Sequence, residues 1–293
     1  MIGVVLAMLG VMCFSLRPVL IKLAYAYVTD PVTLLALRML FSLPFFVAAS
    51  LWLGRTRQQE PIARGDGVAI LALGFLGYYL ASFLDFLGLQ YISAGLGRLV
   101  LFLYPTVVVL LSIVVLRKPA RPREILALAI SYAGLALVLS PAFSSANVDL
   151  PLGAALVFAS GVVYAVYLVG GTEVLRRVGS IRFSAYATIV ASLCCIAQFL
   201  ALRPLSALDL PWIVYGISAV IGIVCTVLPI FMTSEALRRI GANRVAMIGA
   251  LGPVTTIAFS YVGLDEMMTA AQLGGVVLVL GGVLLVSVRR PFR

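Results

Sequence analysis

The charged side chains that interrupt long apolar runs are the residues of this chain best suited to bind a ligand or to react. Arg17, Lys22, Arg38 and Arg98 lie inside such runs, and Asp85 is the one carboxylate well inside a run. A cation at the centre of a lipid-facing helix costs roughly 2.5–3.5 kcal/mol. These side chains should therefore face protein or water, where they can pair with one another or bind a charged ligand.

Other chemistry is excluded by what the sequence lacks. It contains no histidine, which is the commonest metal ligand and the side chain that titrates nearest neutrality. Asp265 and Glu266 form the only adjacent acidic pair, without the companion cluster that a metal-dependent membrane enzyme would need. We expect no metal, no cofactor and no catalysis, and we interpret the cysteines, which lack paired spacing, as small buried hydrophobes: Cys13, Cys194, Cys195 and Cys225.

Polar, aromatic and small side chains recur at helical spacing along several of the apolar runs. Such faces match lipid poorly, and buried tyrosine hydroxyls need partners. We therefore expect a central aromatic and polar cavity, whereas close packing of small residues is the alternative. The residues that we expect to bind a substrate are Arg17, Tyr78, Tyr79, Ser82, Asp85, Arg98, Phe102, Tyr104, Tyr164, Tyr167 and Thr226.

Prolines inside the apolar runs should interrupt helices, because proline cannot donate the helix hydrogen bond. Pro105 and Pro253 should break two helices near mid-span, freeing the carbonyls of Leu101 and Gly249. Broken helices at matching places are the best sequence pointer to a midplane site, and kinks that only shape the bundle are the alternative. The residues assigned to gating or structure are Pro18, Lys22, Arg38, Pro105, Pro229 and Pro253.

Two structural interpretations of the buried charges stay open. Lys22 and Arg38 lie near enough to the expected outer boundary for their long side chains to reach the headgroups. Asp85 and Arg98 lie at matching depth in consecutive spans, so they can form an ion pair without a role in binding. Arg17 lies nearer the midplane and is the hardest to explain in either way.

The elements that position these residues follow from the composition. With 63% hydrophobic and 11% charged residues, the chain has too few polar groups to cover a soluble globule. A crossing needs about 20 apolar residues. We predict an all-α polytopic membrane protein with ten transmembrane helices at about 2–28, 31–53, 67–90, 93–115, 124–143, 150–175, 181–202, 211–237, 242–263 and 268–288.

The distribution of cations predicts the topology. Sixteen of the 21 Lys and Arg residues fall in alternate gaps between the runs, whereas the other gaps contain only Arg203. Cytoplasmic loops accumulate Lys and Arg, so both termini should be cytoplasmic. The net charge of +10 then reflects orientation and attraction to anionic lipid rather than a nucleic-acid partner. Without an organelle address, a bacterial inner (plasma) membrane is the expected location.

An internal repeat is visible when the chain is shifted by 148 residues. Pro105 then coincides with Pro253 and Gly134 with Gly282. Residues 1–143 and 150–293 each contain five predicted crossings, so the second half should run through the membrane inverted relative to the first. Two inverted five-helix repeats around a central cavity are typical of transporters.

Two stretches of the sequence also match a known family. Leu87-Gly88-Leu89-Gln90-Tyr91-Ile92-Ser93-Ala94 leads into Leu103-Tyr104-Pro105, and Glu235 to Ala242 leads into Gly252-Pro253, followed by Gly263-Leu264-Asp265-Glu266. They resemble the EamA repeat of the drug/metabolite transporter superfamily over nearly the whole chain. The sequence departs from that pattern at Arg117-Lys118, where an acidic residue is usual. The resemblance implies an inner-membrane carrier of small metabolites, similar to bacterial exporters of aromatic or other amino acids.

We therefore expect a carrier that works by alternating access and binds a small molecule. The cations would attract a carboxylate, and the tyrosines would accept an aromatic or apolar side chain. Movement should be passive, because only Asp85 could couple transport to protons. The alternatives are a lipid-translocating or structural membrane protein, or an exporter of a purine or sugar derivative. The glycine-rich fifth and tenth spans should serve as scaffold or subunit contact, in a monomer or weak homodimer.

Overall fold

The structure is a computed structural model of the whole chain and describes residues 1–56, 62–114, 122–144, 149–249 and 251–287. Every regular segment in these ranges is helical. A helix satisfies its own backbone hydrogen bonds, as a segment in hydrocarbon must. By length and composition, seven helical stretches among the described residues could cross a membrane, and residues 125–138 and 270–285 form shorter apolar helices.

The first half of the chain forms four stretches of helix and a shorter apolar one. The third stretch joins two α-helices through a π-helical segment, η1, and the fourth is broken between Leu101 and Tyr104. The elements are α1 (Ile2–Tyr25), α2 (Pro31–Thr56), α3 (Arg64–Gly74), η1 (Phe75–Leu80), α4 (Ala81–Gly88), α5 (Ala94–Leu101), α6 (Tyr104–Val114) and α7 (Pro122–Ser144).

The second half repeats this plan. Its third stretch also contains a π-helical segment, η3, and a further helix begins just before Pro253. The elements are α8 (Asp149–Val178), α9 (Ser180–Leu202), the short 3₁₀ helix η2 (Leu205–Leu208), α10 (Trp212–Gly222), η3 (Ile223–Val227), α11 (Leu228–Gly249), α12 (Gly252–Leu264) and α13 (Ala270–Ser287).

Most helix ends lie within a few residues of the predicted spans, but the eighth and ninth spans differ. A turn was expected between residues 237 and 242, whereas α11 continues through this region to Gly249. Ion pairs from Glu235 to Arg238 and Arg239 connect residues three and four positions apart, and such pairs stabilise a helix. The following segment, Ala242 to Ile248, contains no proline and no glycine, although Gly241 and Gly249 flank it, so none of its own residues breaks the helix.

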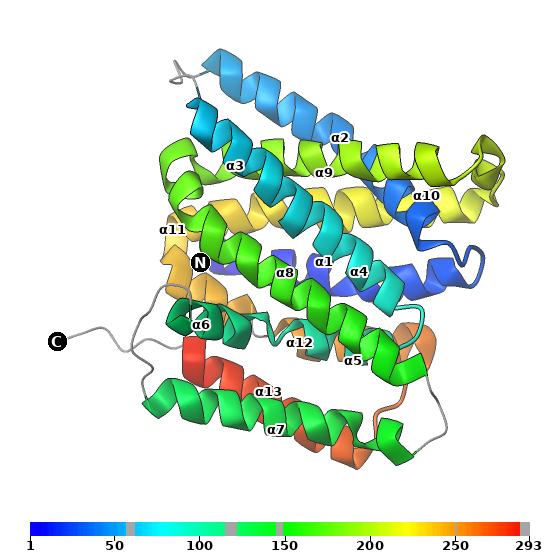
Figure 1. Cartoon of the computed structure of the whole chain (residues 1–293), viewed down its shortest axis with the longest axis vertical. Helices are drawn as coiled ribbons and strands as arrows, with labels where there is room; N and C mark the ends of the chain where they lie inside the picture. Colours follow the sequence, from blue (N-terminus) through cyan, green and yellow to red (C-terminus); the bar gives the residue numbers. More distant parts are fainter. Residues whose placement is uncertain (57–61, 115–121, 145–148, 250, 288–293) are drawn as a thin grey trace.

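The helices pack in a pattern that exchanges elements between the halves (Figure 1). Helix α1 packs against α10, η3, α11 and α12, and we name these five elements the α1 bundle. Helix α8 packs against α3, η1, α4, α5 and α6, and we name these six the α8 bundle. The first helix of each half thus lies against the third and fourth stretches of the other half.

Two pairs of equivalent helices pack antiparallel to each other. Along α2 and α9, Val32 clusters with Phe199 and Phe46 clusters with Ala185, while the Ser192 hydroxyl lies 3.6 Å from the Met39 sulfur. Along α7 and α13, a Cβ on Gly134 would lie 2.8 Å from the Gly275 carbonyl, and one on Gly282 would lie 2.7 Å from the Ala127 carbonyl. Glycine is what permits this second pair to approach so closely.

The two ends of the bundle are distinguished by their polar residues. One end, called here the Asp30 end, contains Asp30, Arg203 and Glu266; the opposite end, called the Asp66 end, contains Asp66 and Arg177. Helices α1 and α3 begin at the Asp66 end, toward the left in Figure 1, and the loop from α1 to α2 lies at the right.

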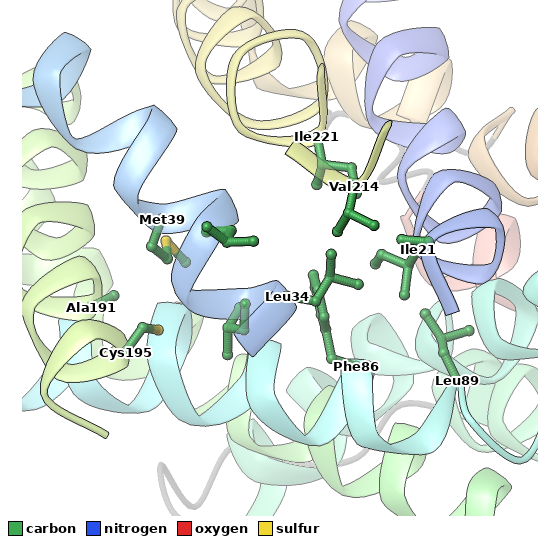
Figure 2. Packing of buried hydrophobic residues seen from close by; sticks show 12 residues of the cluster. Ile21, Leu34, Met39, Phe86, Leu89, Ala191, Cys195, Val214 and Ile221 are labelled. Carbon is green, nitrogen blue, oxygen red and sulfur yellow. The ribbon is translucent and has the colours of Figure 1, made fainter. Parts of the chain in front are cut away.

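A buried apolar cluster fills the molecule toward the Asp30 end. Figure 2 shows Ile21 of α1, Leu34 of α2, Phe86 of α4 and Val214 of α10 pointing toward one another. All four are completely buried, so this layer joins both bundles to α2. The polar site described next begins beside this cluster, at Arg17, one turn before Ile21 in α1, and at Asp85, which directly precedes Phe86 in α4.

Candidate functional site

A buried ion pair joins the two bundles. The Arg17 Nη2 atom of α1 lies 2.6 Å from the Asp85 Oδ2 atom of α4. Arg17 is 6% exposed and Asp85 is 3% exposed. Burying a charge is costly unless it is paired, so Arg17 and Asp85 stabilise each other at the contact between α1 and α4. Asp85 therefore pairs with Arg17. The pair between Asp85 and Arg98, which their matching depth in the sequence had left possible, does not form.

The Phe14 ring brings a second arginine to this pair. The Arg17 guanidinium carbon lies 4.7 Å from the ring centroid, and that of Arg98 lies 4.6 Å from it. Both distances fit a cation–π contact. Arg98 comes from α5, and it lies beside Gly252 at the start of α12, where an added Cβ would be 3.0 Å from its Nη2 atom. The absence of a side chain at Gly252 therefore leaves room for the guanidinium.

A third arginine enters from α2. The Arg38 Nε atom donates a hydrogen bond of 3.2 Å to the Thr226 hydroxyl in η3, and its guanidinium carbon lies 5.4 Å from the centroid of the Phe86 ring. Arg38 is only 2% exposed, so it does not reach a headgroup region. Lys22 is half-buried, and its Nζ donates to the Leu89 carbonyl at 3.1 Å.

Several donor atoms of the three arginines have no acceptor. Arg17 Nε, Arg38 Nη1 and Arg98 Nε are buried without a hydrogen-bond partner among the described residues. Buried polar groups are nearly always satisfied in proteins, and an unsatisfied one costs about 1–3 kcal/mol or more. Three such atoms in one region mark it as a place where an acceptor is needed.

A row of aromatic rings lies beside the arginines, mostly from the α8 bundle. Tyr104 and Tyr164 meet edge to face with centroids 5.1 Å apart, and Tyr164 stacks on Tyr167 at 5.6 Å. The Tyr167 hydroxyl donates to that of Tyr78 at 3.4 Å. At Gly77, an added Cβ would lie 2.2 Å from the Tyr167 ring. This glycine permits the ring to pack against η1.

The predicted substrate residues fall into two groups. Arg17, Asp85 and Arg98 lie together, with Tyr78, Tyr104, Tyr164 and Tyr167 in one connected row, and Thr226 meets Arg38; Ser82 is buried one turn before Asp85. Two others lie at the edge of these groups. Phe102 packs in an apolar cluster that includes Val138 and Val279, and its ring also meets that of Tyr104 edge to face with centroids 6.4 Å apart. Tyr79 stacks against Phe83 beside the cluster of Figure 2.

The prolines differ in their effect on the helices. Helix α5 ends at Leu101 and α6 begins at Tyr104, so the break predicted at Pro105 is confirmed. Helix α11 ends at Gly249 and Pro253 lies in the first turn of α12, so the matching break is confirmed too. Pro18 remains inside α1. Pro229 is buried at the start of α11, where its carbonyl faces Gly10 of α1.

Polar contacts also hold the bundles together at the Asp30 end. The Tyr25 hydroxyl donates to the Phe86 carbonyl at 2.6 Å. Glu266 accepts from the backbone N–H groups of Ala94 and Gly95, at 3.0 and 3.4 Å, at the beginning of α5. A carboxylate is favoured there because the first N–H groups of a helix lack partners within it.

Phe14, Gly77 and Gly252 contribute to this site but were not predicted from the sequence. Phe14 lies three residues before Arg17 and is the ring shared by Arg17 and Arg98, so an aromatic residue one turn from a buried cation was the available signal. Nothing in the sequence distinguishes Gly77 and Gly252 from the many packing glycines. The described residues contain no cluster of three or more metal-binding side chains.

Comparison with known proteins places the chain in a family. The model of the EamA-like transporter family matches residues 1–140 and again residues 151–288. The chain belongs to the EamA-like transporter family. This repeated match covers both halves, as the resemblance in Leu87–Ala94 and Glu235–Ala242 predicted.

Relatives of this EamA-like protein carry transporter names. The uncharacterized transporter YcbK of Bacillus subtilis is 30% identical over 292 residues, which cover 96% of this chain and 92% of the relative. The uncharacterized transporter sll1319 of Synechocystis is 24% identical and covers 98% of this chain and 93% of its own length. An uncharacterized transporter of Archaeoglobus fulgidus is 27% identical, covering 92% of this chain and 95% of its own.

A solved structure supports the fold. A chain described as "Crystal structure of protein" has a TM-score of 0.63 and 18% sequence identity, and covers 97% of this chain and 95% of its own. This EamA-like protein is thus a multi-pass helical membrane protein from a family of transporters. The family supports a carrier rather than an enzyme.

Proposed function

We propose that this EamA-like protein exports a small metabolite, an aromatic or neutral amino acid or a related compound, by alternating access across a bacterial inner membrane. The observation that carries the proposal is the buried Arg17–Asp85 pair between the two bundles, with Arg98 and the tyrosine row beside it. Arginine binds carboxylate well, and tyrosine rings accept an aromatic body. Together they suit a small molecule with one carboxylate and one ring.

The packing pattern supports two inverted repeats. The exchange of α1 and α8 between the halves is symmetric, and α2 runs antiparallel to α9, its equivalent at the 148-residue shift. Equivalent elements that pack antiparallel are related by an axis perpendicular to them. For helices that cross a bilayer, that axis lies in the membrane plane, which is the arrangement of many secondary transporters.

In alternating access, the parts that move relative to each other would be the α1 bundle and the α8 bundle, rather than the two sequence halves. Among the described residues, the hydrogen bonds that join α1, or Glu266 just after α12, to the α8 bundle or to Leu89 just after α4 lie at Arg17–Asp85 or nearer the Asp30 end. With the predicted orientation, that end faces outward. The structure then corresponds to a state closed on the outside, and opening requires these contacts to separate.

The transport should be passive. Proton coupling needs a group that exchanges a proton within the site, and Asp85 is the only buried carboxylate among the described residues. It is already paired with Arg17 at 2.6 Å, so no unpaired buried carboxylate is available among the described residues to exchange a proton. We therefore expect the substrate gradient to drive movement.

A transport assay in liposomes tests the proposal. Purified protein is reconstituted, and uptake of phenylalanine, leucine, alanine, a sugar and a nucleoside is measured with and without a pH gradient. We expect phenylalanine uptake that needs no pH gradient and is lowered by Tyr78→Ala and Arg17→Ala, with Tyr261→Ala, an exposed tyrosine of α12, as the matched control.

Three results would contradict parts of this proposal. Accumulation only under a pH gradient would refute passive movement. Equal rates in both variants and the control would refute the site. Failure of every soluble substrate, with labelled phospholipid moving between leaflets, would instead favour the lipid-translocating alternative.

A further inference from the structure

The three buried arginines carry more charge than the protein neutralises. Arg17, Arg38 and Arg98 are each at least nine-tenths buried, and Asp85 is the only buried acidic side chain among the described residues. A guanidinium group stays protonated in proteins. Because Asp85 neutralises one arginine, the region keeps an excess of two positive charges.

Arg98 is the least satisfied of the three. The structure records no hydrogen bond from its guanidinium to any described residue, and its Nε atom is buried. The face of the Phe14 ring, which has negative character, lies 4.6 Å from its guanidinium carbon. Arg17 shares this ring and has a free Nε atom of its own. The two guanidinium groups therefore present unused donors beside the same aromatic residue.

A ligand that satisfies these donors must bring an acceptor with negative charge. Burial of unpaired cations is unfavourable, and a carboxylate would accept the free N–H groups and offset the excess charge. A positively charged ammonium group on the ligand would find no free carboxylate, because Asp85 is occupied by Arg17. Tyr104 and Tyr164 lie close enough to Arg98 to interact with it electrostatically, so the rest of the ligand would meet the aromatic row.

We propose that the protein binds its substrate as a net organic anion, an aryl carboxylate without a cationic group, whose carboxylate is held by Arg98 and the free Nε atom of Arg17. Arg38 adds to the attraction from α2 without being the main ligand. This proposal rests on the proposed carrier function and narrows its substrate class. It distinguishes a carboxylate that lacks an amine from the zwitterionic amino acid.

Three probes of one carbon skeleton test the proposal. Binding to purified protein in nanodiscs of phosphatidylcholine is measured by calorimetry for 3-phenylpropionate, phenylalanine and 3-phenylpropanamide, which are an anion, a zwitterion and a neutral amide. We expect 3-phenylpropionate to bind at least about tenfold more tightly than the amide and more tightly than phenylalanine. Equal binding of the amide, or tighter binding of phenylalanine, would overturn the proposal.

Variants assign the effect to the arginines. Arg98→Gln should weaken binding of 3-phenylpropionate by about tenfold or more and leave the amide unchanged, and Arg98→Lys should restore part of the loss. Arg203→Gln, at an exposed arginine in the loop after α9, is the matched control. Equal weakening of anion and amide by Arg98→Gln would indicate a structural role and refute the assignment. If Arg98→Gln does not fold, the three probes on the wild-type protein still decide.

Three further outcomes separate this proposal from others. Inorganic phosphate should not displace 3-phenylpropionate at equal concentration, and displacement would mean that any small anion fills the site. Binding of 3-phenylpropionate without transport in liposomes would refute the carrier and leave the anion site. Transport of phenylalanine without a preference for the anion would refute the anion site and leave the carrier.

Discussion

Tyr78 and Thr226 occupy equivalent positions in two π-helical segments, 148 residues apart, one in each half of the chain. The Tyr78 hydroxyl accepts from Tyr167 of the α8 bundle, and the Thr226 hydroxyl accepts from Arg38 of α2. A π-helical turn disturbs regular hydrogen bonding and often occurs at functional sites. Each half therefore directs a polar side chain inward from the place where its third helical stretch is widened.

Because Arg38 donates to the Thr226 hydroxyl, we expect removal of this hydroxyl to lower the stability of the protein. Thr226→Val preserves the shape of the side chain but leaves the buried Arg38 Nε atom without an acceptor. We expect a loss of about 1–3 kcal/mol of stability, measured as a lower melting temperature in detergent. Thr255→Val, at an exposed threonine that bonds only its own helix, should change the melting temperature much less. An equal change in both variants would contradict the importance of this contact.

The Arg17–Asp85 pair predicts strong coupling between α1 and α4. Asp85→Asn and Arg17→Met each leave one buried charge without its partner, which costs about 3–5 kcal/mol. The double variant removes both charges, so we expect it to be more stable than the sum of the single effects allows. A double-mutant cycle on denaturation in detergent measures this coupling. Additive effects would show that the two charges do not stabilise each other.

Gly77 predicts a steric effect on the tyrosine row. In Gly77→Ala the added methyl group would lie 2.2 Å from the Tyr167 ring, so the ring must move. We expect the KM for transport to rise, because the Tyr167 ring stacks on Tyr164 and its hydroxyl donates a hydrogen bond to Tyr78. Gly216→Ala, where an added Cβ meets nothing within 4 Å, is the control. An unchanged KM in Gly77→Ala would remove the tyrosine row from the binding site.

We expect the ionisation of Asp30, in the loop between α1 and α2, to make the stability of the protein depend on pH. Partial burial opposes the charged form, but hydrogen bonds from Arg203 and Thr33 outweigh it, so the pKa of Asp30 lies below its ordinary value. A lowered folded-state pKa means that this contribution is present above the unfolded pKa, about 3.9, and is lost as pH falls through the folded pKa. Melting curves from pH 7 to pH 3 should show a smaller loss for Asp30→Asn than for wild type. Identical pH profiles would contradict this contribution.

Much of the fold could be predicted from the sequence because hydrocarbon imposes a simple rule. A run of apolar residues of sufficient length must be helical, so bounds such as 31–53 and 181–202 lie close to α2 and α9. The continuous α11 could not be predicted, since the Arg238 and Arg239 cluster is typical of a loop and yet forms ion pairs along a helix. The same two arginines are thus the kind of charge that marks a cytoplasmic loop and the partners that stabilise a helix by local ion pairs.

The candidate site was only partly predictable. Charges inside apolar runs identified Arg17, Asp85 and Arg98, because few alternatives exist for a charge in a membrane. Which charges pair depends on rotation about each helix axis, and helical spacing along one helix does not determine the neighbouring helix. For that reason the sequence left a pair between Asp85 and Arg98 open, whereas Asp85 pairs with Arg17.

Counterflow in liposomes is the most direct test of the central claim, that the bundles alternate around a site formed by the buried arginines and the tyrosine row. Liposomes loaded with unlabelled phenylalanine or 3-phenylpropionate are diluted into the labelled compound without a pH gradient. We predict transient accumulation of label in wild type and in Tyr261→Ala, with a KM raised roughly threefold to tenfold in Tyr164→Ala. Absence of counterflow for both compounds, or an unchanged KM in Tyr164→Ala, would contradict the account.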